Sequence, residues 1–147
     1  EHRHSAHLDD LLNHYHNIKE ALANDRLEEA KAHLADFKNE VTNAEEMSDH
    51  PRHETMHDEH HQAMISAVEI ASRASNIDEF RQAFSGISEH LAMAVQNQEY
   101  EGQTLFLQYC PMAIDGKGAT WLSTTREIQN PYMGQKMPGC GETKSEL

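Results

Sequence analysis

Apolar residues recur at intervals of three and four residues through the first hundred positions, in four separate segments. The segments are 8–22, 27–44, 57–71 and 80–95. This spacing places the apolar side chains on one face of an α-helix, which each helix can bury against its neighbours. Because the breaks between the segments are short, successive helices are expected to run antiparallel. The pattern predicts a mainly α-helical fold with an up-down-up-down four-helix bundle over residues 1–97.

The breaks between the segments carry helix-starting signals. Asp25 and Asn76 each precede a glutamate by three positions, Glu28 and Glu79, which is the spacing of a capping box. Pro51 suits the first turn of the third helix, where a missing backbone N–H costs nothing. These signals predict that Asp25 and Asn76 cap the second and fourth helices.

After residue 97 the composition no longer favours helices. Residues 104–109 and 119–123 have strand character and flank the turn-forming sequence Asp-Gly-Lys-Gly, which predicts a short β-hairpin. The rest of this C-terminal tail is rich in turn formers and poor in apolar residues, so it is expected to pack on the bundle through Phe106, Trp121 and Tyr132. Residues 1–147 would then form a single domain, with the bundle over 1–97 and the tail over 98–147.

Charge and motifs exclude several classes of function. The formal net charge is −13 with histidine counted as neutral, which disfavours nucleic acid and anionic membranes as partners. No run of about 18 apolar residues occurs, so no membrane insertion is expected. No nucleophile–base pair, phosphate-binding loop or pair of catalytic carboxylates stands out, so the chain is expected not to be an enzyme. The sequence does not indicate the oligomeric state.

Histidine is unusually abundant, with twelve residues in 147, and five of them lie between positions 50 and 61. His53, His57 and His61 are spaced i,i+4, and His57 and His60 are spaced i,i+3. On a helix these spacings put the side chains on one face, about 5–6 Å apart at Cβ, which is close enough to share an ion. Imidazole binds copper and zinc readily. Because the segment lacks a complete HExxH motif, metal-dependent hydrolysis is discounted.

The predicted topology brings more histidines to the same end of the bundle, and the tail that bears both cysteines also starts there. We therefore predict a copper or zinc site at this end, whose ligands are His53, His57, His60, His61, His7 and His90, with His2 and His4 as possible additions. Two alternatives are that the histidines form a solvated surface, and that His57 and His61 are hydrogen-bonded core residues. His14, His16 and His33 are interpreted as surface histidines.

The tail contains a second set of metal ligands, formed by sulfur. Cys110 and Met112 are two residues apart, and Met137 and Cys140 are three apart, so each pair lies within reach of a single ion. Thiolate and thioether sulfur select Cu(I), and thiolate also accepts Zn(II). Two alternatives stay open: a Cys110–Cys140 disulfide, which would stabilise the fold by roughly 3–4 kcal/mol, and a pair of inert thiols.

The tail motifs also resemble a known family. They are CPMA at 110–113, GATWLS at 118–123, NPYMG at 130–134 and MPGCG at 137–141, and FRQAFSGISEHLA at 80–92 matches the family's helical half. They are similar to an uncharacterised bacterial domain family. Its members occur alone in secreted proteins and fused to periplasmic adaptor subunits of copper/silver (heavy-metal) efflux pumps. The resemblance covers roughly residues 8–144. The chain departs from the family at Pro138, where a hydrophobic residue is usual, and in the histidine-rich segment, which is peculiar to this chain.

The resemblance implies a periplasmic, secreted or cell-surface location and an association with copper or related metals, without supplying a ligand set. The expected function is therefore a transition-metal-binding domain for metal handling or resistance, with copper, as Cu(I) or Cu(II), as the first ion and zinc as the second. The alternative is an interaction module that docks on a heavy-metal efflux adaptor without a specific metal site of its own.

Overall fold

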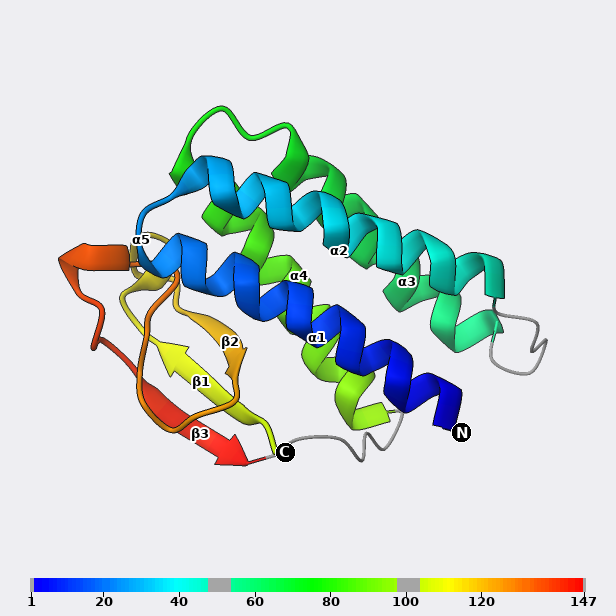
Figure 1. The fold of residues 1–147 in the computed structure, drawn as a ribbon. Coiled ribbons are helices and arrows are strands. Elements are labelled where there is room, and N and C mark those ends of the chain that lie inside the picture. Colours follow the sequence, from blue (N-terminus) through cyan, green and yellow to red (C-terminus); the bar gives the residue numbers. More distant parts are fainter. Residues whose placement is uncertain (1, 48–53, 98–103, 147) are drawn as a thin grey trace.

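Four long helices form the first two thirds of the computed structural model, which describes residues 2–47, 54–97 and 104–146, with side chains described for 9–41, 63–96 and 104–146. The helices are α1 (His2–Ala23), α2 (Leu27–Met47), α3 (Glu54–Ser72) and α4 (Ile77–Asn97). Successive helices run antiparallel (Figure 1), so the start of α1, the end of α2, the start of α3 and the end of α4 share one end of the bundle. The predicted up-down-up-down arrangement is confirmed.

The apolar stripe of each helix lies in the core. The largest fully buried helical side chains come from the predicted stripe positions, among them Leu12, Tyr15, Ile18, Leu22, Leu34, Phe37, Phe80, Phe84, Ile87 and Leu91. Burial of one such aliphatic or aromatic side chain stabilises the fold by roughly 1.5–3 kcal/mol. None of the described helices is both long enough and apolar enough to cross a membrane.

The two predicted capping boxes have different outcomes. Asn76 caps α4 as expected, since its Oδ1 accepts a 2.9 Å hydrogen bond from the backbone N–H of Glu79. The Glu79 carboxylate reaches back to the backbone N–H of Ser75 at 2.9 Å. The carboxylate of Asp25 is instead used for tertiary contacts: its oxygens accept bonds from Arg81 Nη2 at 2.7 Å and from the backbone N–H of Gln135 at 3.2 Å. Asp25 therefore joins the α1–α2 turn to α4 and to the tail.

The tail forms a small antiparallel sheet of β1 (Phe106–Cys110), β2 (Ala119–Ser123) and β3 (Glu142–Glu146), with a short α5 (Ala113–Gly116) and a 3₁₀ turn η1 (Gly134–Lys136) between strands. The strand order is β2-β1-β3. The predicted hairpin is β1 with β2, in which Cys110 lies opposite Ala119. The third strand was not predicted, because β3 has no apolar residue and its side chains are mostly exposed. Strand β3 is held in the sheet by its main-chain pairing with β1.

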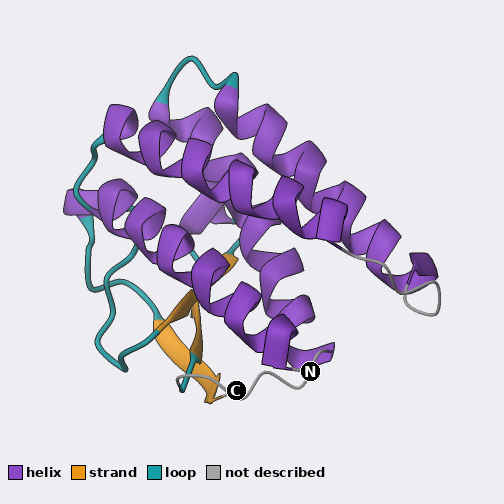
Figure 2. Ribbon diagram, turned by 45° about the vertical axis from the view of Figure 1, so that its right-hand side comes forward, coloured by secondary structure: helices purple, strands orange, loops and turns teal. Residues whose placement is uncertain are grey.

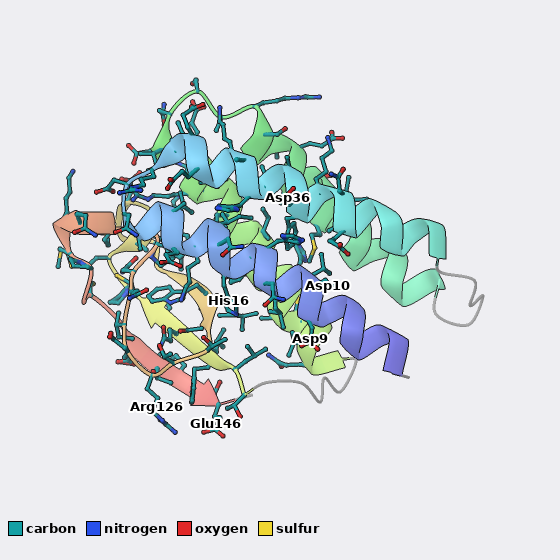
Figure 3. All side chains as sticks on the ribbon, viewed as in Figure 1. Asp9, Asp10, His16, Asp36, Arg126 and Glu146 are labelled. Atoms are coloured by element: carbon teal, nitrogen blue, oxygen red, sulfur yellow. The ribbon has the colours of Figure 1, made fainter. Side chains whose placement is uncertain are left out.

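The sheet lies beside α1 and α4, on the side of the bundle away from α2 and α3 (Figures 1 and 2). Trp121 and Tyr132 pack into the helical core, as predicted. Phe106 does not join that core cluster: its ring lies 4.8 Å from the guanidinium carbon of Arg126. Arg126 also pairs with Glu146 of β3 at 3.1 Å, on the outer surface of the sheet (Figure 3).

Buried hydroxyl groups tie the sheet to the helices. The Tyr15 hydroxyl of α1 bonds to Ser88 Oγ of α4 at 2.7 Å and accepts a 3.0 Å bond from the backbone N–H of Leu122 in β2. The Tyr132 hydroxyl donates to the backbone carbonyl of Thr120 at 2.7 Å. Because buried polar groups are costly when left without partners, these bonds hold the sheet at one position on the bundle.

Candidate functional site

Two cysteine side chains, Cys110 and Cys140, meet in the tail as free thiols. Their Sγ atoms lie 2.8 Å apart although the residues are thirty positions apart in the sequence. Cys110 ends the central strand β1 and is fully buried, whereas Cys140 is partly exposed and lies just before β3. The pairing of β1 with β3 therefore brings the two thiols together.

The main chain of Cys140 is held by hydrogen bonds on both sides. Asn130 Nδ2 donates to the Cys140 carbonyl at 2.7 Å, and the Cys140 N–H donates to the Met137 carbonyl at 3.1 Å. Asn130 Oδ1 accepts bonds from the N–H groups of Tyr132 at 2.8 Å and Met133 at 3.0 Å. Asn130 of the NPY segment is thus part of the scaffold that holds the main chain of Cys140.

Trp121 lies beside Gly141, the residue after Cys140. Gly141 has φ of +136°, and a Cβ at that position would lie 2.9 Å from the Tyr109 carbonyl oxygen and 3.0 Å from Trp121 Cη2. Glycine is required there by both its conformation and its close approach to the sheet. Since Trp121 is the only tryptophan in the chain, we expect its fluorescence to respond to changes at the neighbouring Cys140–Gly141 segment.

The two methionines predicted as ligands, Met112 and Met137, are exposed by 53% and 39%, respectively. Met112 is followed by a turn in which Ile114 and Asp115 have φ of +52° and +53°. A left-handed conformation costs a non-glycine residue about 1–2 kcal/mol, and strain of this kind is concentrated at functional sites. The chain therefore keeps an unfavourable backbone conformation directly after the Cys-Pro-Met segment.

A soft metal ion fits this donor set. Two thiolates that bind one ion at about 2.3 Å each lie at most about 4.6 Å apart, and a disulfide bond measures about 2.05 Å. The Sγ–Sγ distance of 2.8 Å lies between these values, so small side-chain rotations reach either state. The hydrogen bond with Cys110, together with partial burial, raises the pKa of the Cys140 thiol. Metal binding must therefore displace thiol protons.

The histidines predicted as ligands are only partly described. His53 lies outside the described residues. His2, His4 and His7 lie on α1, and His57, His60 and His61 on α3, at positions whose side chains are not described. The helical backbone of α3 confirms the predicted i,i+3 and i,i+4 spacing of the last three. His90 is partly buried on α4. Among the described side chains, no group of three or more His, Cys, Asp or Glu residues is arranged to hold an ion.

The cysteine pair does not lie with the histidines. The tail starts at the predicted end of the bundle, but β1 leads it toward the opposite end, where α1 finishes (Figure 1). There the chain before Cys140 docks on the α1–α2 turn, with Gln135 Nε2 donating to the Ala23 carbonyl at 2.9 Å. The sulfur ligands and the histidine-rich helix ends are therefore separate, although the tail starts at the histidine-rich end as predicted.

Two basic side chains on the sheet-facing side of α1 were not predicted as buried. Lys19 is 8% exposed, its Nζ donates to Ser123 Oγ at 3.4 Å, and burial lowers its pKa to about 8. His16 lies one turn earlier on the same helix (Figure 3) and is partly buried, and both of its ring nitrogens lack a hydrogen-bond partner among the described residues. Burial, followed by the charge of Lys19, lowers its pKa to about 4. The interpretation of His16 as a solvated surface residue is wrong.

His16 is expected to make the fold less stable in acid. Its folded pKa of about 4 lies below the ordinary 6.5, so between these values the unfolded chain binds more protons and stability falls as the pH falls. The total loss of folding free energy from protonation of His16 is at most about 3 kcal/mol. Urea unfolding at pH 7.0, 5.5 and 4.5 should show a smaller acid loss for His16→Phe than for the native protein. Parallel pH dependence in the two proteins would refute this assignment.

These features define a four-helix protein with a dithiol in its C-terminal sheet. A family model described as a protein of unknown function (DUF3347) matches residues 11–102, and the chain belongs to that family. No curated protein and no solved structure matches the chain. The matched range covers most of α1 through α4 and ends before β1, so the cysteines and the tail motifs lie outside it.

Proposed function

We propose that the protein binds copper as Cu(I) through the thiols of Cys110 and Cys140. The observation that carries this proposal is the 2.8 Å separation of the two Sγ atoms, which belong to one fully buried and one partly exposed cysteine. A buried thiol supplies a fixed ligand away from water, and a partly exposed one gives the ion access. Met112 and Met137, which are exposed and lie two and three positions from a cysteine in the sequence, are the further soft donors that we propose. Zinc is the second ion, because thiolates also bind Zn(II).

The role that we propose is metal handling or resistance in the periplasm or at the cell surface, by binding and not by catalysis. The net charge of −13 supports a cation-binding protein, because it attracts metal ions and repels anionic partners. The resemblance of the tail to domains fused to heavy-metal efflux adaptors supports such an adaptor as the partner that receives the ion.

Titration of the reduced protein with Cu(I) under anaerobic conditions tests this site. We expect Trp121 fluorescence to be quenched with an end point near one equivalent, because the ring lies beside Gly141, which follows Cys140 in the chain. Cys110→Ser/Cys140→Ser should abolish the quenching and weaken Cu(I) binding by about 100-fold or more, since the thiolates are the ligands that select this ion. Met93→Leu, which removes an exposed methionine of α4, is the control and should bind normally. Undiminished affinity in the double cysteine variant would refute the site.

The histidine-rich start of α3 is a second candidate site, for divalent ions. The observation that favours it is the continuous helix over Glu54–Ser72, which fixes the i,i+4 spacing of His57 and His61. We expect Cu(II) or Zn(II) to bind there more weakly at pH 5.5 than at pH 7.5, because protons compete for imidazoles of ordinary pKa about 6.5. His57→Ala should weaken binding most, since His57 belongs to both i,i+4 pairs.

Calorimetric titration at the two pH values compares the native protein with His57→Ala and His53→Ala/His61→Ala. His33→Ala is the control, because it removes a histidine that lies on α2 outside the cluster. Equal binding by all four proteins, without pH dependence, would show that the histidine cluster has no role in metal binding.

A further inference from the structure

We propose that the cysteine pair also undergoes reversible thiol–disulfide exchange, in which Cys140 reacts with an external disulfide and Cys110 resolves the resulting mixed disulfide. The asymmetry of the pair assigns these roles. Cys110 has no exposed surface, whereas Cys140 is partly exposed. An external sulfur atom can therefore reach only Cys140 in the folded protein.

The surroundings of Cys140 leave room for an incoming reagent. A Cβ added to the neighbouring Gly139 would meet no atom within 4 Å, so the space on that side is open. On its other side Gly141 packs against Tyr109 and Trp121. An external disulfide would thus approach from the Gly139 side, and Cys110 lies on the protein side of the same sulfur atom.

The second step is favoured by proximity. Cys110 Sγ is 2.8 Å from Cys140 Sγ, so a disulfide of about 2.05 Å requires the atoms to approach by only about 0.8 Å. Cys110 is fixed in the central strand, and Asn130 and Met137 hold the main chain of Cys140. Ring closure is therefore an intramolecular reaction between groups that are already in place, which gives a high effective concentration.

The exchange is balanced in atoms and electrons. The Cys140 thiolate attacks one sulfur of a small disulfide RSSR, forms a Cys140–SR bond and releases RS⁻, which takes up a proton as RSH. The Cys110 thiol then loses its proton and attacks Cys140 Sγ, which forms the Cys110–Cys140 bond and releases a second RSH. Two electrons pass from the protein dithiol to RSSR, and a reducing dithiol reverses both steps.

Thiol–disulfide exchange would also control metal binding, a consequence that rests on the proposed function. A disulfide offers no thiolate to an ion, so oxidation of the pair and binding of Cu(I) exclude each other. The redox state of Cys110 and Cys140 would then decide whether the protein holds its ion or releases it.

The roles are tested with 2-hydroxyethyl disulfide on reduced, metal-free protein in the presence of a chelator, with mass spectrometry of samples quenched in acid. Cys110→Ser should accumulate one stable adduct on Cys140. Cys140→Ser should form an adduct on Cys110 about 100-fold more slowly, because that thiol is buried. The native protein should lose two hydrogens without accumulating an adduct, and its Trp121 fluorescence should change. Addition of dithiothreitol should restore the original mass and the original fluorescence.

A second measurement needs no variant: brief alkylation of the reduced native protein with iodoacetamide, followed by peptide mapping, should place the label on Cys140. Equal reactivity of the two cysteines, or a native mixed disulfide that persists, would overturn the assigned roles. Because no metal is present in these experiments, neither result bears on the Cu(I) proposal, which the Cu(I) titration tests separately.

Discussion

Replacing Arg81 by methionine is expected to lower the free energy of unfolding by about 2–4 kcal/mol, because two buried backbone carbonyls lose the charged donor that they share. The Arg81 side chain, 8% exposed, donates to the Pro131 carbonyl at 2.8 Å, to the Leu22 carbonyl at 2.7 Å and to Asp25 Oδ1 at 2.7 Å. These three acceptors belong to the tail, the end of α1 and the α1–α2 turn. Without the guanidinium they lose a common donor, and the tail loses its attachment near the cysteine pair.

Urea unfolding measures this loss, and limited proteolysis should show faster cleavage of the tail after residue 104. Arg26→Met is the matched control, because Arg26 is exposed and pairs with Glu29 on the surface, at 3.4 Å. Such surface pairs contribute about 0–1 kcal/mol. Equal losses of stability in the two variants would contradict the role given to Arg81.

Gly134→Ala is expected to destabilise the protein by about 2–4 kcal/mol, because it combines backbone strain with overpacking. Gly134 has φ of +60°, and a Cβ there would overlap the Asp25 carboxylate and the Arg81 guanidinium. The substitution therefore disturbs the same contact as Arg81→Met from the tail side, and tail cleavage should again accelerate.

Gly139→Ala provides the comparison for Gly134→Ala. A Cβ at Gly139 meets no atom within 4 Å, and this residue does not have the left-handed φ of Gly134. Thermal unfolding should place Gly139→Ala close to the native protein and Gly134→Ala well below it. A Gly134→Ala variant as stable as Gly139→Ala would show that the tail does not depend on close approach to the α1–α2 turn.

The four helices and the first hairpin were predicted from the sequence because their signals are local. Stripe residues such as Leu12 and Phe84 lie in the core at the expected spacing. Strand β3 gives no such signal, because Glu142–Glu146 is polar and forms only through pairing with β1. The burial of Arg81 was not predicted for a related reason. A charged residue type indicates exposure, whereas the burial of Arg81 depends on hydrogen-bond acceptors that lie fifty or more positions away in the sequence.

The sulfur ligands of the candidate site were also predicted, but their geometry was not. Spacing identified Cys110 with Met112 and Met137 with Cys140 as possible ligand pairs, and a Cys110–Cys140 disulfide stayed open as an alternative. The approach of the two cysteines to 2.8 Å depends on the β1–β3 pairing, which the sequence pattern does not contain. The same pairing carries the cysteines away from the histidine-rich end of the bundle. The burial of His16 depends on tertiary packing around α1, which no periodicity within α1 indicates.

X-ray absorption at the copper edge of the protein loaded with one equivalent of Cu(I) is the most direct test of the sulfur site. The proposed site predicts a first shell of sulfur atoms at about 2.3 Å, the metal–thiolate distance known from zinc sites. That shell should disappear in Cys110→Ser/Cys140→Ser. A first shell of nitrogen atoms alone, at about 2.0 Å, would contradict the sulfur site and assign Cu(I) binding to the histidines.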